Sequence, residues 1–176
     1  RHDRVAWAYA QGALRRGAHI WQHTRAVGVL REGERVVGVQ TDRGPIHAGT
    51  VVSAVGGDVT TVAGWAGVRL PIRTHALQAF VTNAYAQEFP GIVSSNDLVF
   101  YVSQTPRGQM LIGAEFDRQA SYQQATTYTY LQACARKAVT VLPFLGKLRI
   151  LRSWTGICDV STDFSPILGD SGVDGF

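Results

Sequence analysis

The sequence contains few of the residues that mark specialised classes of protein. Its 176 residues include two cysteines, one methionine and six prolines, and no segment repeats or has low complexity. Two cysteines cannot build a disulfide framework, which indicates either a reducing compartment or incidental thiols, and we expect the cytoplasm. No apolar run approaches the roughly 20 residues that span a bilayer, and the first residues lack a signal-peptide pattern, so we expect no membrane association.

Charged residues and histidines give no sign of nucleic-acid binding, metal binding or covalent hydrolysis. The net charge is +4, but the lysines and arginines are dispersed and do not alternate with aromatics, which argues against a nucleic-acid partner. None of the five histidines forms a recognised ligand pair, so we expect no metal. No serine lies in a nucleophile elbow and neither cysteine lies beside a histidine, which leaves a covalent hydrolase unsupported.

The first third of the chain alternates helix and strand patterns. These predict, in order, a helix over residues 3–16 that Asp3 caps, a short strand over 19–22, a hairpin of 26–30 and 35–41, and a buried strand over 50–54. The last strand ends in small residues, Ala54-Val55-Gly56-Gly57. Small residues let the backbone approach a cofactor at the edge of a sheet, although an ordinary glycine turn explains the pattern better by itself.

From about residue 68 the pattern changes to longer alternating strands. It predicts one antiparallel sheet of 73–82, 98–104 and 109–115, a long helix over 122–142 with Cys134 in the core, and a strand over 148–155. With a hydrophobic content of 45%, the chain can bury a core. The sequence therefore predicts a mixed α/β and α+β fold, in which a helix-covered antiparallel sheet is inserted between two parts of an α/β domain, with boundaries near residues 68 and 155.

Two carboxylates follow the last predicted strand, in a loop-rich stretch over 156–169. Asp159 and Asp163 flank the turn after Trp154-Thr155-Gly156 and could form a general acid and base pair. Aspartates in turns more often accept hydrogen bonds from nearby backbone N–H groups, so loop capping is the preferred interpretation.

Five stretches together resemble the FAD-dependent amine oxidases, a family that includes sarcosine oxidase, glycine oxidase and D-amino-acid oxidase. They are RHDRVAWAYAQGALRRGAHI, GERVVGVQTDRGPIHAGTVVSAVGG, LPIRTHALQAFVT, FYVSQTPRGQMLIGAEFD and RSWTGICDVSTDFSPILGD. The start Arg1-His2-Asp3, together with Leu77-Gln78-Ala79 and Tyr101-x-x-Gln104, is similar to the beta-subunit family of heterotetrameric bacterial sarcosine oxidases. The resemblance covers essentially the whole chain.

The resemblance also implies an organisation in domains. Residues 1–67 would form part of a Rossmann-like FAD-binding domain, 68–155 a substrate domain, and 156–176 the start of the return to the FAD-binding domain. In that family a GxGxxG loop precedes the segment that matches Arg1, and a flavin-contacting segment with a functional lysine follows the one that matches Phe176. Neither is in this sequence. We therefore expect the 176-residue chain alone to bind FAD weakly or not at all, and to be inactive.

By the same resemblance, two flavins have partners in this chain. FMN would be joined covalently to His2, whose neutral imidazole nitrogen can attack the 8-methyl carbon of a flavin, and Arg1 and Arg152 are candidate partners of the FMN phosphate. FAD would contact the backbone at Val27 and pass beside Ala54 to Gly56. The chain has Ala-Val-Gly where relatives often have Ala-Thr-Gly, which departs from the family pattern.

The reaction that the resemblance implies is the oxidative demethylation of sarcosine to glycine. Electrons would pass from FAD to FMN and then to oxygen, which becomes peroxide. Tetrahydrofolate on another subunit would take the one-carbon unit, and the partners would be alpha, gamma and delta subunits of a heterotetramer. Tyr101 on the predicted sheet is a candidate substrate-facing residue, with plain strand packing as the alternative.

Two alternatives remain open at this point. One is a related flavin enzyme that acts on dimethylglycine, glycine or proline. The other is a noncatalytic subunit that keeps the fold for assembly.

Overall fold

The computed structural model describes residues 2–114 and 116–176, apart from the side chain of His2. Contacts divide the chain into two compact units: one comprises the chain up to Ser53 with Val62–Val68 and Asp170–Phe176, and the other Ala54–Thr61 with Arg69–Gly169. Each unit contains an antiparallel sheet, and the predicted mixed α and β fold is confirmed. The assignment of these parts to FAD-binding and substrate domains stays a prediction.

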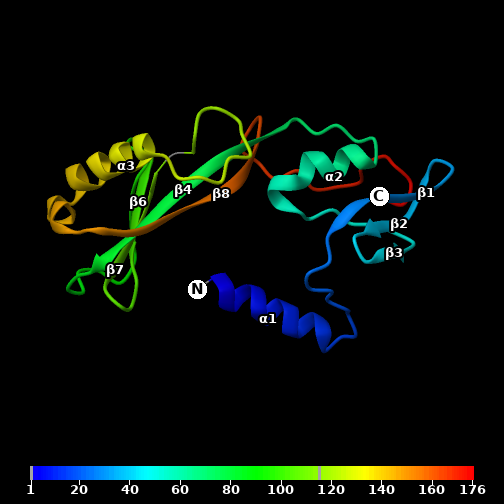
Figure 1. Ribbon diagram of the computed structural model, residues 1–176, viewed down its shortest axis with the longest axis horizontal. Helices are drawn as coiled ribbons and strands as arrows, with labels where there is room; N and C mark the ends of the chain where they lie inside the picture. The colour runs from blue at the N-terminus through cyan, green and yellow to red at the C-terminus, as the bar shows by residue number, and fades with distance from the viewer. Residues whose placement is uncertain (1, 115) are drawn as a thin grey trace. The chain divides into compact units, whose positions relative to one another are not determined.

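The first unit holds a helix and a small meander of strands. Helix α1 (His2–Leu14) begins one residue before Asp3, which lies in its first turn. The predicted hairpin is confirmed as β1 (Ala26–Glu32) and β2 (Arg35–Thr41), and β3 (Gly44–His47) pairs with β2 (Figure 1).

The C-terminal segment packs beside β2 in the same unit. Val36 is completely buried, and its N–H donates to Asp174 O at 2.9 Å. The Arg35 guanidinium lies 2.6 Å from the Asp174 carboxylate. Residues that lie 139 positions apart therefore hold each other in place.

Two predicted strands in the first third of the chain are wrong. Residues 19–22 and 50–54 are irregular, because no strand of the described chain pairs along them and their apolar side chains stay partly outside the core. Val52 is 84% exposed. A 3-10 turn, η1 (Gly56–Asp58), and a helix, α2 (Val59–Trp65), follow instead of a simple glycine turn.

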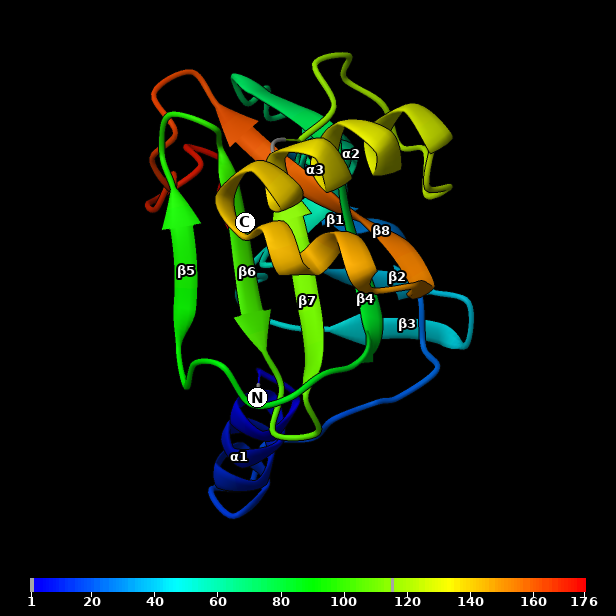
Figure 2. The same ribbon diagram turned by 90° about the vertical axis from the view of Figure 1, so that its left-hand side faces the viewer.

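The second unit is built on a five-stranded antiparallel sheet. Its strands are β4 (Ile72–Ala84), β5 (Ile92–Ser95), β6 (Phe100–Gln104), β7 (Gln109–Ala114) and β8 (Ile150–Ser161). Their order is β5-β6-β7-β4-β8, as Figure 2 shows. The predicted antiparallel sheet is confirmed, β5 was not predicted, and β8 runs past residue 155 because it stays paired with β4 as far as Ser161.

One long helix covers one face of this sheet. Helix α3 (Tyr128–Val141) lies across β6 and β7 (Figure 2), and the 3-10 turn η2 (Pro143–Lys147) follows it and packs against it. The helix begins at Tyr128 rather than 122, because Thr127 in extended conformation accepts the Tyr130 N–H and caps it. Cys134 is 1% exposed and lies in the core, as predicted.

A buried glutamine ties the start of α3 to the sheet. Gln78 on β4 is 1% exposed; its Oε1 accepts the Thr127 N–H at 2.8 Å and its Nε2 donates to the Asp117 carboxylate at 3.0 Å. The Tyr130 hydroxyl donates to the Gln78 carbonyl and accepts the Ala114 N–H. Because each of these buried groups is paired, α3 has one register on the sheet.

Burial raises the pKa of the Cys134 thiol from 9.0 to about 11. In the unfolded chain the thiol ionises near pH 9, whereas the folded core keeps it neutral, so the contribution of this thiol to stability is complete below pH 9 and falls as pH rises to 11. We expect Cys134→Ala in the full-length protein to show a smaller loss of stability between pH 9 and 11 than the parent, measured by urea midpoints. An equal loss in both proteins would contradict this.

Candidate functional site

The second unit presents a face of its sheet that points away from α3, which we call the outer face. Side chains alternate along a strand: Phe100 and Val102 of β6 enter the core under α3, so Tyr101 between them points to the outer face. Paired residues on neighbouring strands share a face. The row that starts at Tyr101 therefore continues through the partners Gly113, Ala79 and Trp154.

This row combines two aromatic side chains with a floor of small residues. Four adjacent strands contribute one residue each, and strands lie about 4.8 Å apart, so the backbones of Tyr101 and Trp154 are roughly 14 Å apart. Trp154 is 41% exposed, whereas Ala79 between them is 7% exposed. On the outer face, two aromatic side chains therefore lie at the ends of a row whose two middle residues are small.

Tyr101 leans over the sheet toward the centre of this row. Its ring and hydroxyl oxygen lie directly above Gly113. Burial, with a smaller effect of the nearby Cys134 thiol, raises the pKa of Tyr101 above 10. At neutral pH the phenol is a neutral hydrogen-bond donor and acceptor.

Arg152 lies on the same strand and the same face as Trp154. Its guanidinium carbon is 5.8 Å from the centre of the Trp154 ring, within cation–π range. Both side chains are exposed. The structure therefore places Arg152 on the outer face near the row of Tyr101, and its predicted role as a partner of the FMN phosphate stays a prediction.

The residues of the predicted FAD contacts are exposed. Val27 on β1 is 49% exposed. Ala54 and Gly56 are exposed as well, and Gly56 adopts a left-handed φ of 56° with open space where a Cβ would lie. These features fit a close approach of a dinucleotide. Val27 belongs to one compact unit, and Ala54 and Gly56 to the other.

The predicted FMN attachment lies at the start of α1. Arg1 lies outside the described residues, and of His2 the structure describes the helical backbone alone. The covalent FMN site at His2 and the role of Arg1 stay predictions. Among the described residues, no group of three or more His, Cys, Asp or Glu side chains could hold a metal ion.

The two carboxylates after the turn have separate structural roles. Asp163 Oδ1 accepts the Ser165 N–H at 3.0 Å and the Ser161 hydroxyl at 3.1 Å, and these bonds lower the pKa of Asp163. Asp159 on β8 accepts the Thr74 hydroxyl at 3.2 Å. Loop capping by Asp163 is confirmed, and Asp159 bonds across the sheet instead.

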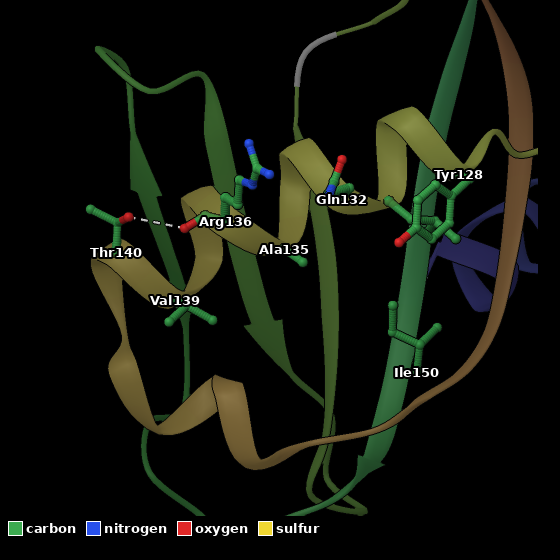
Figure 3. Close-up of a pocket in the computed structure, with 8 residues that line it drawn as sticks. Tyr128, Gln132, Ala135, Arg136, Val139, Thr140 and Ile150 are labelled. Atoms are coloured by element: carbon green, nitrogen blue, oxygen red, sulfur yellow. Dashed lines mark hydrogen bonds between the residues drawn. The ribbon is translucent and has the colours of Figure 1, made fainter.

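A separate groove of about 760 Å³ lies along α3, outside the outer face. Figure 3 shows its lining, in which seven residues of α3 lie with Ile150 at the start of β8. Arg136 is the one charged residue of that lining. The predicted site residues of the described chain do not line it, so this groove is distinct from the candidate site.

A family model described as FAD dependent oxidoreductase matches residues 1–176. The chain belongs to this FAD-dependent oxidoreductase family. The match covers residues of both compact units. No helix in the described part of this family member is both long and apolar enough to cross a membrane.

Two curated relatives of this FAD-dependent oxidoreductase share high identity over nearly its whole length. The chain is 41% identical over 174 residues to the sarcosine oxidase subunit beta of Rhizobium meliloti, covering 99% of this chain and 42% of the relative. It is 38% identical over 173 residues to that of an Arthrobacter species, covering 98% and 43%. The chain therefore spans about two fifths of the curated relatives that it matches.

A solved structure has the same fold. L-proline dehydrogenase from P. horikoshii superposes with a TM-score of 0.90 at 27% identity, covering 97% of this chain and 47% of that one.

Sequence patterns did not reveal the row on the outer face as a unit. Tyr101 was a candidate by resemblance, but Gly113, Ala79 and Trp154 lie on three other strands. Their proximity follows from the register of β6, β7, β4 and β8. To predict the row from the sequence, one would need to know which strands pair, because strands far apart in the sequence are neighbours in this sheet.

A close packing contact fixes the turn beside the predicted FAD contacts. A Cβ at Gly57 would lie 2.9 Å from Ile157 Cβ, so we expect Gly57→Ala to lower the free energy of unfolding by about 1–3 kcal/mol. Urea denaturation of the full-length protein measures this. Gly64→Ala is the control, since a Cβ there meets nothing within 4 Å. Equal stability of both variants would contradict the contact.

Proposed function

We propose that the full-length protein is a flavin-dependent oxidoreductase subunit that oxidises the small secondary amine sarcosine. The observation that carries this proposal is the identity of 38–41% to sarcosine oxidase beta subunits over nearly the whole chain. The outer face supports it, because two aromatic rings flank a floor of small residues there and suit a ligand with an N-methyl group.

Bound FAD would supply the acceptor for a hydride equivalent from the N-methyl carbon of the substrate. Tyr101 would orient the substrate, since its neutral phenol can donate a hydrogen bond to the substrate carboxylate while the ring excludes water. Trp154 would close the other side of the site, and its ring attracts a positively charged amine. Ala79, the next residue of the row, adds only a methyl group beside the Tyr101 ring.

The rest of the proposal concerns the assembly. His2 would hold FMN covalently, with Arg1 and Arg152 near its phosphate, and the products would be glycine and peroxide. Tetrahydrofolate on another subunit would take the one-carbon unit. The relatives are named as subunits, which supports a multi-subunit enzyme with alpha, gamma and delta partners. The cytoplasm is the proposed location.

Oxidation of proline is the second candidate. The similarity to L-proline dehydrogenase, at a TM-score of 0.90 and 27% identity, favours it over other amines. Proline is also a secondary amine and carries its carboxylate on the carbon next to nitrogen. Measurement of kcat/KM for sarcosine, proline, dimethylglycine and glycine on the full-length protein with its partner subunits tests both candidates. The proposal predicts the highest value for sarcosine, and a higher value for proline would replace it.

The covalent flavin is tested at His2. The full-length protein, purified with its partners and denatured in acid, should retain a flavin on this chain, because a covalent bond survives unfolding. His2→Ala should lose that flavin. His19→Ala is the control and should keep it. A flavin released from the parent on denaturation, or retained by His2→Ala, would count against attachment at His2.

The substrate contact is tested at Tyr101. Tyr101→Phe keeps the ring but removes the hydroxyl, so we expect kcat/KM for sarcosine to fall about 10-fold, equivalent to one hydrogen bond to a charged group. Steady-state oxygen consumption measures it. Tyr128→Phe is the matched control, because Tyr128 is 78% exposed on α3. An unchanged kcat/KM in Tyr101→Phe would rule out the proposed contact.

A further inference from the structure

Gly113 lies in the middle of the outer face at a position where a side chain does not fit. A Cβ built at Gly113 would lie 2.4 Å from Tyr101 Cε1, and 2.5 Å from both Cζ and the hydroxyl oxygen. Ordinary van der Waals contacts of a Cβ begin near 3.4 Å. The ring of Tyr101 thus occupies the space that any other residue at 113 would fill.

The backbone offers no other reason for glycine at this position. Gly113 lies inside β7 and pairs regularly with Tyr101 on one side and Ala79 on the other. It does not adopt the left-handed conformation that requires glycine elsewhere in this chain. Glycine weakens the interior of a strand and often marks a place where another group approaches the backbone closely. Here that group is the Tyr101 ring.

We propose that Gly113 is a positioning residue, whose missing side chain lets Tyr101 lie across β7 and brings its hydroxyl to the centre of the outer face. This inference rests on the proposed function, because it assigns to Tyr101 a substrate on that face. The neighbouring residue in the row, Ala79, has the next smallest side chain, so the ring can incline toward it without obstruction. Trp154 then limits the site on the far side.

The inclined ring determines where the hydroxyl meets a ligand. Tyr101 is partly buried in this position, and its raised pKa is consistent with a phenol held against the sheet. A methyl group at 113 would push the ring outward by about 1 Å, the difference between 2.4 Å and an ordinary contact. A misplacement of about 1 Å in a catalytic site can lower the rate about 100-fold.

Kinetics of four variants test this role in the full-length protein with its partner subunits. We expect Gly113→Ala to lower kcat/KM for sarcosine about 10- to 100-fold. In a Tyr101→Ala background, the same change should alter kcat/KM by less than about 2-fold, because no ring remains to be displaced. Gly91→Ala is the control, since its Cβ meets nothing within 4 Å. An equal loss in both backgrounds, or no loss in either, overturns the proposal.

Titration of Tyr101 gives a readout that does not depend on turnover. The difference between the phenolate absorbance of a protein and that of its Tyr101→Phe counterpart reports the ionisation of Tyr101. Gly113→Ala should lower the pKa of Tyr101 toward 10, because the displaced ring becomes more exposed. An unchanged titration overturns the proposal. If the protein does not oxidise sarcosine, the proposed function fails, and this titration still decides whether Gly113 seats the ring.

Discussion

In the described part of the chain, helix α3 packs against the five-stranded sheet, and a helix can cover one face of a sheet but not both. The helix is fixed by buried polar bonds from Gln78 and Tyr130 and by the core around Cys134. Alternate residues of β6 and β7, together with Phe80 of β4, thereby enter the core under α3. The remaining residues form the outer face, and the candidate site depends on this division.

The central strands β7 and β4 contribute only small side chains to the middle of the row on the outer face. Gly113 and Ala79 contribute almost no side chain, while the flanking strands contribute Tyr101 and Trp154. Apolar pockets with a few well-placed polar groups are the usual form of small-molecule sites. Tyr101 supplies a hydroxyl there, which under the proposed function would orient the substrate carboxylate.

Local patterns predicted the elements whose side chains alternate or repeat clearly. β6 and β7, the β1–β2 hairpin, and the buried face of α3 around Cys134 follow from such patterns. The apolar run over 50–54 has the composition of a buried strand, but strands need paired neighbours and none lies along it in the described chain. Conversely, β5 is four residues long with two serines, and α2 contains β-branched residues and a glycine, so neither gave a clear pattern.

The candidate site was predictable in part, for a different reason. Tyr101 was a candidate because of the family resemblance, and the family is now shown by the match over residues 1–176. Its orientation was not predictable, because it depends on Gly113 of the neighbouring strand. Tyr101 and Gly113 lie on different strands, and the register of β6 with β7 brings them into contact.

We propose that the substrate binds at the outer face, between Tyr101 and Trp154. A structure of the full-length protein with flavin and a carboxylic acid analogue of sarcosine that lacks the amine tests it directly. We expect the analogue to lie between Tyr101 and Trp154, with its carboxylate within hydrogen-bonding distance of the Tyr101 hydroxyl and the flavin ring facing the same side of the sheet. An analogue bound elsewhere, with Tyr101 and Trp154 away from the flavin, would contradict it.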